Sequence, residues 1–173
     1  GVLRGILHEP VEARDLPPVI MFSGWGGTRY GPNRILLEAA RDLATDGRAV
    51  LRVDFRGRGD SDGFVDEHDL RSHIIDGRTM VAWSRRNLAD RPPVLLGICS
   101  GGEVAVGCLF DGLDVDSVCL LSLIHISEPT RLLSISYAVF CLKKKTILAT
   151  NPPLSVSSNS PVPNTANAHL LSH

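Results

Sequence analysis

A short stretch, GICSGG at residues 97–102, sets a thiol between glycines and directly follows the apolar run PVLL at residues 93–96. A buried strand that ends in a sharp turn and continues as a helix holds the residue at its tip above the sheet edge. The tip also faces the helix N-terminus, whose partial positive charge favours a thiolate, the attacking form of cysteine. The stretch therefore predicts a cysteine nucleophile.

Spacing selects Cys99 as the residue at the tip of this turn. The residues two before and two after the tip nearly touch and must be small, and Gly97 and Gly101 meet that condition. Placing Ser100 at the tip would put Ile98 in one of these positions, where it does not fit. A glycine-rich turn around a small buried cysteine remains the alternative interpretation.

Two further apolar runs end in glycine-rich turns. Residues 19–22 (VIMF) lead into SGWGG at residues 23–27, and residues 49–55 (AVLRVDF) lead into RGRGDSDG at residues 56–63. Each run predicts a buried strand that ends in a turn.

In these three turns the chain resembles the α/β-hydrolase family, which carries an oxyanion turn, a DxRGxGxS turn and a nucleophile elbow in this order. The resemblance covers residues 2–120 and implies a doubly wound, mostly parallel α/β sheet, here a truncated α/β-hydrolase fold. It implies that the backbone N–H groups of Trp25 and Ser100 form the oxyanion hole beside Cys99. The family usually has His-Gly before the first donor, and Ser23 stands in place of that histidine.

The elbow and the stretch GWGGTRYGPNR look most like hydrolases that accompany bacterial exosortase systems, and dienelactone hydrolases also carry cysteine at the elbow. The resemblance implies hydrolysis of small-molecule acyl esters or thioesters, without a cofactor or a metal. Acyl transfer to another acceptor is a second interpretation, and a non-catalytic binding module is a third. The family's catalytic acid and histidine follow the elbow on later loops, so we do not expect His125, His169 or His173 to complete a triad.

Composition changes abruptly near residue 121. All sixteen glycines lie at or before Gly112, no aspartate follows Asp116, and the only lysines are residues 143–145. Back-translated with suitable codons, residues 121–131 and 135–144 resemble two parts of a transposase-type sequencing adapter, in one frame. We therefore expect residues 1–120 to be the N-terminal part of a hydrolase domain and residues 121–173 to be adapter read-through without a domain.

A disordered tail rich in Ser and Pro is the alternative interpretation of that segment. If it is read-through, the chain is a fragment, and we expect it to be inactive because the late acid and histidine are absent. No stretch of the sequence is long and apolar enough to span a membrane.

Charge and cysteine spacing bear on partners and location. Residues 1–120 hold 14 arginines and 18 acidic residues, a net charge of −4, which gives no electrostatic case for binding nucleic acid. Cys99, Cys108 and Cys119 lack metal-ligand spacing and fit the reduced thiols of a cytoplasmic protein. The sequence leaves the oligomeric state and the identity of the acyl substrate open.

The remaining elements follow from periodicity. We expect an edge strand at residues 2–8 and a last strand at residues 115–121. The resemblance implies that the strands containing Val50, Ile20, Leu95 and Val118 follow the edge strand in that spatial order.

Three helices are predicted between these strands. The first is capped by Asn33 and ends at Gly47, the second spans residues 69–87, and the third begins at Gly101. The apolar positions expected on the second helix are Leu70, Ile74, Val81 and Leu88. His68 and His73 are expected to be surface residues of that helix.

Overall fold

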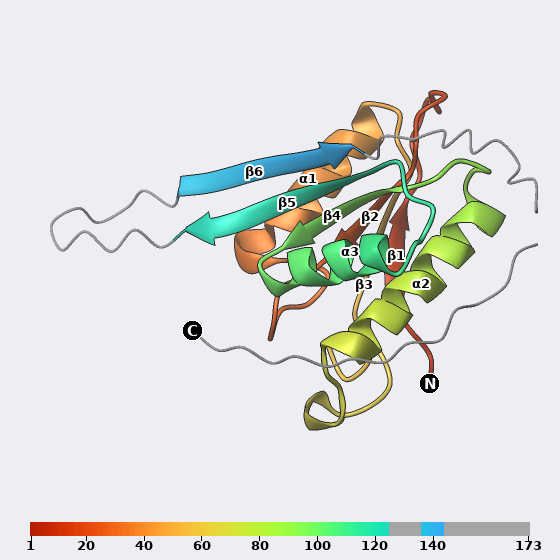
Figure 1. Cartoon of the computed structure of the whole chain (residues 1–173). Coiled ribbons are helices and arrows are strands. Elements are labelled where there is room, and N and C mark those ends of the chain that lie inside the picture. Colours follow the sequence, from red (N-terminus) through yellow and green to blue (C-terminus); the bar gives the residue numbers. More distant parts are fainter. Residues whose placement is uncertain (125–135, 144–173) are drawn as a thin grey trace, which may run out of the picture.

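The computed structural model describes residues 1–124 and 136–143, which form one sheet with helices on both of its faces (Figure 1). The strands are β1 (Gly5–His8), β2 (Val19–Phe22), β3 (Val50–Val53), β4 (Val94–Ile98), β5 (Ser117–Ile124) and β6 (Ser136–Lys143). The α-helices are α1 (Ile35–Thr45), α2 (Leu70–Asn87) and α3 (Ser100–Phe110), and two short 3-10 turns are η1 (Pro32–Arg34) and η2 (Val65–Glu67).

The sheet has the order β1-β3-β2-β4-β5-β6. Strands β3, β2, β4 and β5 run parallel, and β1 pairs antiparallel with β3 at one edge. The predicted fold class and the predicted order of the first five strands are confirmed. Parallel neighbours need crossover connections, and the helices that provide them cover the two faces.

Strand β5 continues to Ile124, past the composition break, and β6 pairs with it antiparallel over its whole length. Strand β6 was not predicted from the sequence. An open strand edge is a template for any segment that can extend, and SYAVFCLK at residues 136–143 is rich in residues that favour strands. This pairing does not bear on where the codons of the segment come from.

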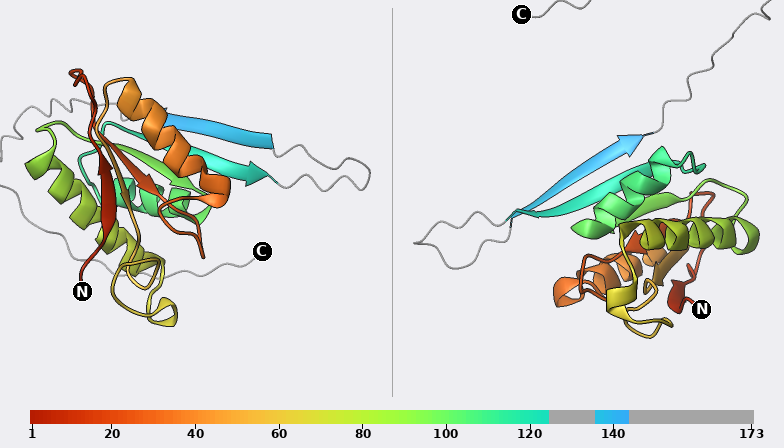
Figure 2. Two further views of the ribbon diagram at one scale, coloured as in Figure 1. Left: turned by 180° about the vertical axis from the view of Figure 1, so that it is seen from behind. Right: turned by 60° about the horizontal axis from the view of Figure 1, so that its bottom comes forward.

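Helix α1 covers one face of the sheet, and α2 and α3 lie together on the other (Figures 1 and 2). Leu36 of α1 packs with Met21 and Val50, all three of them buried. On the opposite face the core is larger and contains Phe22 and Val104.

The ends of α1 differ from each other in how they are held. Asn33 does not cap the helix as predicted, because it and Arg34 adopt left-handed backbone conformations before the helix begins. At the other end Gly47 is left-handed as predicted, with φ 93°. The N–H of Gly47 bonds to Ala44 and that of Arg48 to Leu43, the pattern of a glycine-terminated helix.

Helix α2 begins at a capping aspartate, since the Asp69 carboxylate accepts from the N–H of Ser72 at 2.8 Å. The buried face of α2 includes Val81 as predicted, and Ile74 packs against the core, but the rest of the face differs from the prediction. Leu70 is 41% exposed, and the buried positions are His73, Asp76, Gly77, Met80, Val81 and Ser84. These positions are three and four residues apart, so they form one helical stripe, but half of them are polar.

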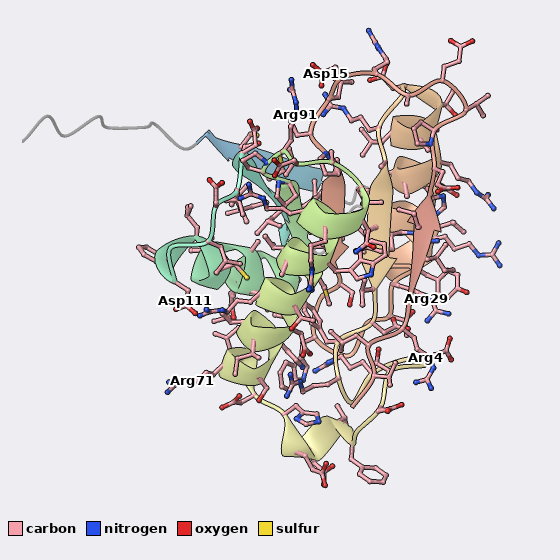
Figure 3. The ribbon with its side chains drawn as sticks, turned by 90° about the vertical axis from the view of Figure 1, so that its right-hand side faces the viewer. Arg4, Asp15, Arg29, Arg71, Arg91 and Asp111 are labelled. Carbon is pink, nitrogen blue, oxygen red and sulfur yellow. The ribbon has the colours of Figure 1, made fainter. Side chains whose placement is uncertain are left out.

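Loops at the amino ends of the central strands are joined by exposed ion pairs. Arg91 and Asp15 lie 2.6 Å apart and connect the segments that precede β4 and β2 (Figure 3). Exposed pairs of this kind contribute little to stability, so the packed faces of the sheet hold the fold. Within the described residues no helix has the length and apolar character needed to cross a membrane.

Candidate active site

Cys99 lies between the last residue of β4 and the first residue of α3. Its backbone has φ 53° and ψ −125°, a conformation that costs a non-glycine residue free energy and that clusters at functional sites. The side chain is exposed, and the N–H donates to the carbonyl of Leu121 at 3.0 Å. The chain thus holds a thiol in solvent at a strained turn, next to the N-terminus of an eleven-residue helix.

The glycines around this turn are required by close backbone contacts. A Cβ atom on Gly97 would overlap the backbone of Gly101, and one on Gly101 would overlap the carbonyl of Phe22. A Cβ on Gly24 would lie 3.1 Å from the Cβ of Cys99. The Cys99 turn and the end of β2 therefore lie so close together that only glycine fits at these positions.

The turn after β2 brings a second set of residues to the same edge of the sheet. Ser23 is buried and its hydroxyl donates to the carbonyl of Gly27 at 3.3 Å, while the N–H of Gly27 donates to Gly24. Among the described residues, the hydrogen bonds outside helices and strands use neither the N–H of Trp25 nor that of Ser100 as a donor. Both predicted oxyanion donors are therefore available.

The turn after β3 is organised by Asp54, whose side chain is fully buried. Its carboxylate accepts from the backbone N–H of Arg29 at 2.6 Å and from that of Asp60 at 3.1 Å, and it pairs with the Arg29 guanidinium. Gly59 is left-handed and lies against this carboxylate, so no side chain fits there. One buried carboxylate thereby connects the turns that follow β2 and β3.

Arg56 connects the same turn to α2. Its backbone N–H and its Nε donate to the buried carboxylate of Asp76 at 2.9 and 2.7 Å. These bonds raise the pKa of Arg56, against a smaller opposing effect of burial. Asp76 in the polar stripe of α2 thus receives a charged residue from the sheet edge.

Arg58 and His73 are both buried, with 6% and 4% of their surface exposed. Neither Arg58 Nη1, Arg58 Nη2 nor His73 Nε2 has a hydrogen-bond partner among the described residues. The guanidinium lies 4.4 Å from the centroid of the Trp25 ring, and the imidazole stacks on Phe55. A buried charge without an acceptor costs several kcal/mol of free energy, of which a desolvated cation–π contact offsets about 2 kcal/mol.

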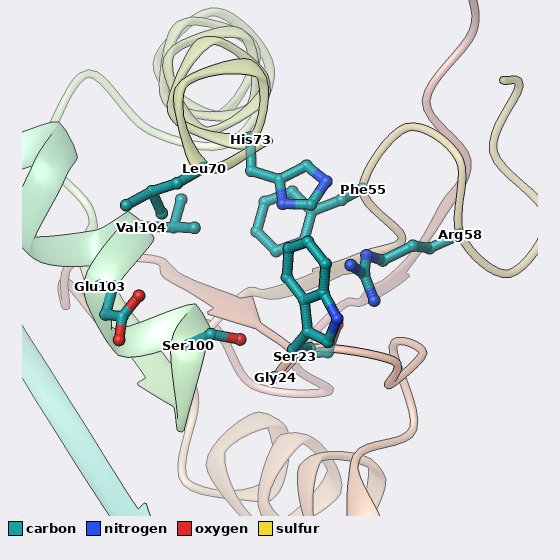
Figure 4. A pocket seen from close by; sticks show the side chains of 10 residues that line it. Ser23, Gly24, Phe55, Arg58, Leu70, His73, Ser100, Glu103 and Val104 are labelled. Atoms are coloured by element: carbon teal, nitrogen blue, oxygen red, sulfur yellow. The ribbon is translucent and has the colours of Figure 1, made fainter. Parts of the chain in front are cut away.

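These two side chains point into one small pocket beside Ser100, with a cavity of about 50 Å³ (Figure 4). Ser23, Gly24, Trp25 and Glu103 also line it. The prediction that His73 is a surface residue is wrong, and His68 precedes α2 instead of lying on it. The helical spacing from His73 to Asp76 could have signalled a buried polar stripe, whereas no sequence signal marks Arg58 as unpaired.

The other side of the Cys99 turn opens onto an apolar groove of about 560 Å³. Its walls come from α2, α3 and β5 and include Cys99 together with Ile74, Val106, Phe110 and Leu120. The thiol therefore lies between a small polar pocket and a wide apolar surface.

The other thiols have different surroundings. Cys108 is fully buried, and loss of hydration raises its pKa to about 12. Cys119 is half-buried in β5, and burial followed by its neighbour Cys141 raises its pKa to about 12. An exposed Cys99 is thus the thiol that the described fold presents at the carboxyl edge of the parallel strands.

Within the described residues, no hydrogen bond joins the Cys99 thiol to a histidine or a carboxylate, and no group of three potential ligands could hold a metal. His125, His169 and His173 lie outside the described residues. The described part of the site thus contains the predicted nucleophile and donors, without a general base beside the thiol.

Comparison with known proteins agrees with this geometry. A family model described as the alpha/beta hydrolase fold matches residues 17–106, which include all three turns. None of the curated proteins matches the chain at a significant level of sequence similarity.

Several solved structures resemble the chain. Alpha/beta hydrolase GrgF from Penicillium sp. sh18 is 28% identical, with a TM-score of 0.59 over 70% of this chain and 42% of that protein. Est1E from Butyrivibrio proteoclasticus, with bound ferulic acid, is 21% identical, with a TM-score of 0.59 over 67% of this chain and 47% of its own. The esterase Pf2001 from Pyrococcus furiosus is 23% identical, with a TM-score of 0.55 over 66% and 43%. The chain spans less than half the length of these three proteins.

Proposed function

Because the chain belongs to the α/β-hydrolase fold family, we propose that it acts on acyl esters or thioesters, with Cys99 as the nucleophile. The observation that carries the proposal is the backbone of Cys99, which is held at φ 53° between glycines that cannot be replaced without overlap. Strain of this kind persists only where the surrounding structure enforces it. A glycine-rich turn without a function would not require an exposed thiol at its tip.

The proposed reaction begins when the Cys99 thiolate attacks the carbonyl carbon of the substrate. A bond forms between Sγ and carbon, and the negative charge on the carbonyl oxygen is met by the N–H groups of Trp25 and Ser100. The carbon–oxygen or carbon–sulfur bond of the leaving group then breaks, and an alcohol or thiol departs with a proton. Water releases the acid from the resulting thioester and restores the thiol.

The second step needs a base to activate water, and no described histidine or carboxylate is hydrogen-bonded to the Cys99 thiol. We therefore expect the chain to be acylated more readily than it turns over. The apolar groove that includes Cys99 and Val106 would hold the acyl chain during both steps.

The test uses acylation, which does not depend on turnover. The chain is incubated with p-nitrophenyl butyrate near neutral pH, and acyl adducts are located by peptide mass spectrometry. We expect Cys99 to be acylated at least about tenfold faster in the folded chain than in the urea-unfolded chain, because only the fold aligns the two N–H donors.

Variants make this test decisive. Cys99→Ala should remove the adduct, and Ser100→Ala should keep it, since Ser100 contributes only its backbone N–H. Cys141 in the urea-unfolded chain serves as an internal control for unassisted reactivity, because in the folded chain its sulfur lies 2.9 Å from that of Cys119. Reaction of Cys99 at the rate of Cys141, or loss of the adduct in Ser100→Ala alone, would contradict the proposal.

A further inference from the structure

The pocket beside Ser100 contains the guanidinium of Arg58, which is hydrogen-bonded through neither terminal nitrogen to any described residue. Arg58 is almost completely buried, and both of its terminal nitrogens lack an acceptor. The Trp25 ring covers one face of the guanidinium. Stacking leaves the edge of a guanidinium free, and this edge is the part that binds a carboxylate through two parallel hydrogen bonds.

The two buried carboxylates near this turn are already engaged by other groups. Asp54 is bonded to Arg29 and to the N–H of Asp60, and Asp76 is bonded to Arg56. Arg58 follows Arg56 by two residues but receives no such partner. The turn therefore neutralises one of its two arginines internally and turns the other toward the pocket.

The Arg58 guanidinium of the pocket can pair with a single carboxylate. Burial, followed by the nearby Arg58, lowers the pKa of His73, so the imidazole is neutral near pH 7 and adds no second positive charge. Glu103 lines the wall opposite Arg58 without pairing with it (Figure 4). A cavity of about 50 Å³ has room for a group as small as a carboxylate.

We propose that Arg58 and the pocket it lines with His73 and Trp25 form a subsite for a carboxylate group of the substrate. The subsite adjoins Ser100 and Gly24, which flank Cys99. The favoured substrate is thus an acyl compound with a free carboxylate a few bonds from the reacting carbonyl. This role rests on the proposed function, but the binding of the carboxylate itself does not.

Binding can be measured through Trp25, because its ring covers Arg58. The chain has two tryptophans, so Trp83→Phe leaves Trp25 as the only indole, and Cys99→Ala excludes any covalent reaction. The double variant is titrated with monomethyl succinate, with the uncharged dimethyl succinate and with inorganic phosphate. We expect a saturable change in Trp25 emission with the monoester and none with the diester. Phosphate should cause such a change only at higher concentration, if at all.

Arg58→Gln in this background should weaken binding of the monoester about tenfold or more, since it removes the charge and the paired donors. Arg58→Lys keeps the charge but loses the fork, and should bind with intermediate strength. Arg78→Gln removes the same charge from an exposed position of α2 and should change binding by less than about twofold.

Equal binding of the monoester and the diester, unchanged binding in Arg58→Gln, or tighter binding of phosphate would each overturn the assignment. Should Arg58→Gln fail to fold, the comparison of monoester with diester and the Arg58→Lys variant still decide it. If p-nitrophenyl butyrate acylates Cys99 but the monoester does not bind, the proposed subsite is overturned and the proposed function is not. If the monoester binds but Cys99 is not acylated, the proposed function is overturned and the proposed subsite is not.

Discussion

The two sides of the Cys99 turn are built in different ways. On one side is a small pocket with both charged and aromatic side chains, in which two nitrogens of Arg58 and one of His73 have no hydrogen-bond partner among the described residues. On the other is a wide groove with apolar walls, which include Ile74 and Val106. Packing of the fold does not explain the unpaired groups of the pocket, because buried polar groups normally have hydrogen-bond partners. Nor does it explain why the walls of the groove are exposed, unlike those of the interior. We attribute the unpaired groups of the pocket to the proposed carboxylate subsite.

The largest expected effect comes from the turn that both sides share. Gly101→Ala should lower the free energy of unfolding by about 3 kcal/mol, because the new Cβ overlaps the backbone of Phe22. Gly102→Ala is the matched control in the same helix, since its Cβ would meet only the end of the Leu120 side chain at 3.2 Å. Urea unfolding followed by circular dichroism compares them. Equal stability of the two variants would show that the backbone contact is not tight.

The second prediction compares the two arginines of the turn after β3. Arg56→Gln leaves the buried Asp76 without its charged partner and should cost about 2 kcal/mol, less than a fully buried pair because a third of the Arg56 side chain is exposed. Arg58→Gln should change the free energy of unfolding by less than about 1 kcal/mol, since removal of an unpaired charge offsets the lost contact with Trp25.

Denaturant unfolding of both variants at pH 7 measures this difference. A loss in Arg58→Gln as large as that in Arg56→Gln would mean that Arg58 serves the fold. In that case Arg58 and Arg56 would contribute equally to stability, and the pocket of Arg58 would not differ in this respect from the site of Asp76.

The third prediction concerns the groove. Val106→Asp places a charge on its wall and should slow acylation of Cys99 by p-nitrophenyl octanoate about tenfold relative to p-nitrophenyl acetate. Ile75→Asp introduces the same charge on an exposed position of α2 that does not line the groove, and it should leave the ratio of the two rates unchanged. A ratio that is equal in both variants would mean that the acyl chain lies elsewhere.

Much of the fold can be predicted from the apolar runs that precede the three glycine turns. A continuous apolar run bounded by turns is typical of a strand buried on both faces of a parallel sheet. The spacing of Gly97, Cys99 and Gly101 also predicts the geometry of the turn. Family membership is shown for residues 17–106. The roles of Cys99, Trp25 and Ser100 stay predictions, as does the assignment of residues 121–173 to adapter read-through.

The polar half of the site could not be predicted in the same way. Apolar periodicity selects Leu70 and Ile74 on α2, whereas the buried stripe contains His73 and Asp76. Burial of Asp76 depends on a partner from another part of the chain, Arg56. The spacing of residues along α2 does not predict which distant residue will be that partner. The lack of an acceptor for Arg58 is likewise a property of the assembled turns.

The smallest expected effect is the pH dependence that His73 confers on stability. Its pKa in the folded chain is lowered from the ordinary value of 6.5, mainly by burial and then by Arg58. The unfolded chain therefore binds a proton at higher pH than the folded chain does. The stability contributed by the neutral imidazole is complete above pH 6.5 and is lost as the pH falls from there toward the folded-state pKa.

His73→Phe should remove this part of the acid sensitivity, so the difference in free energy of unfolding between the two proteins should shift by about 1 kcal/mol between pH 7.5 and pH 5.5. His68→Phe is the comparison variant: His68 lies outside the pocket and only contributes to lowering the pKa of His73, so its removal should change this acid sensitivity less than His73→Phe does. Saturating monomethyl succinate adds a sharper test. A bound carboxylate beside Arg58 favours the protonated imidazole, so the ligand should reduce the acid sensitivity of the parent chain and leave that of His73→Phe unaltered. A ligand effect of equal size in both proteins would place the carboxylate away from His73 and break the link between the unpaired nitrogens and the pocket.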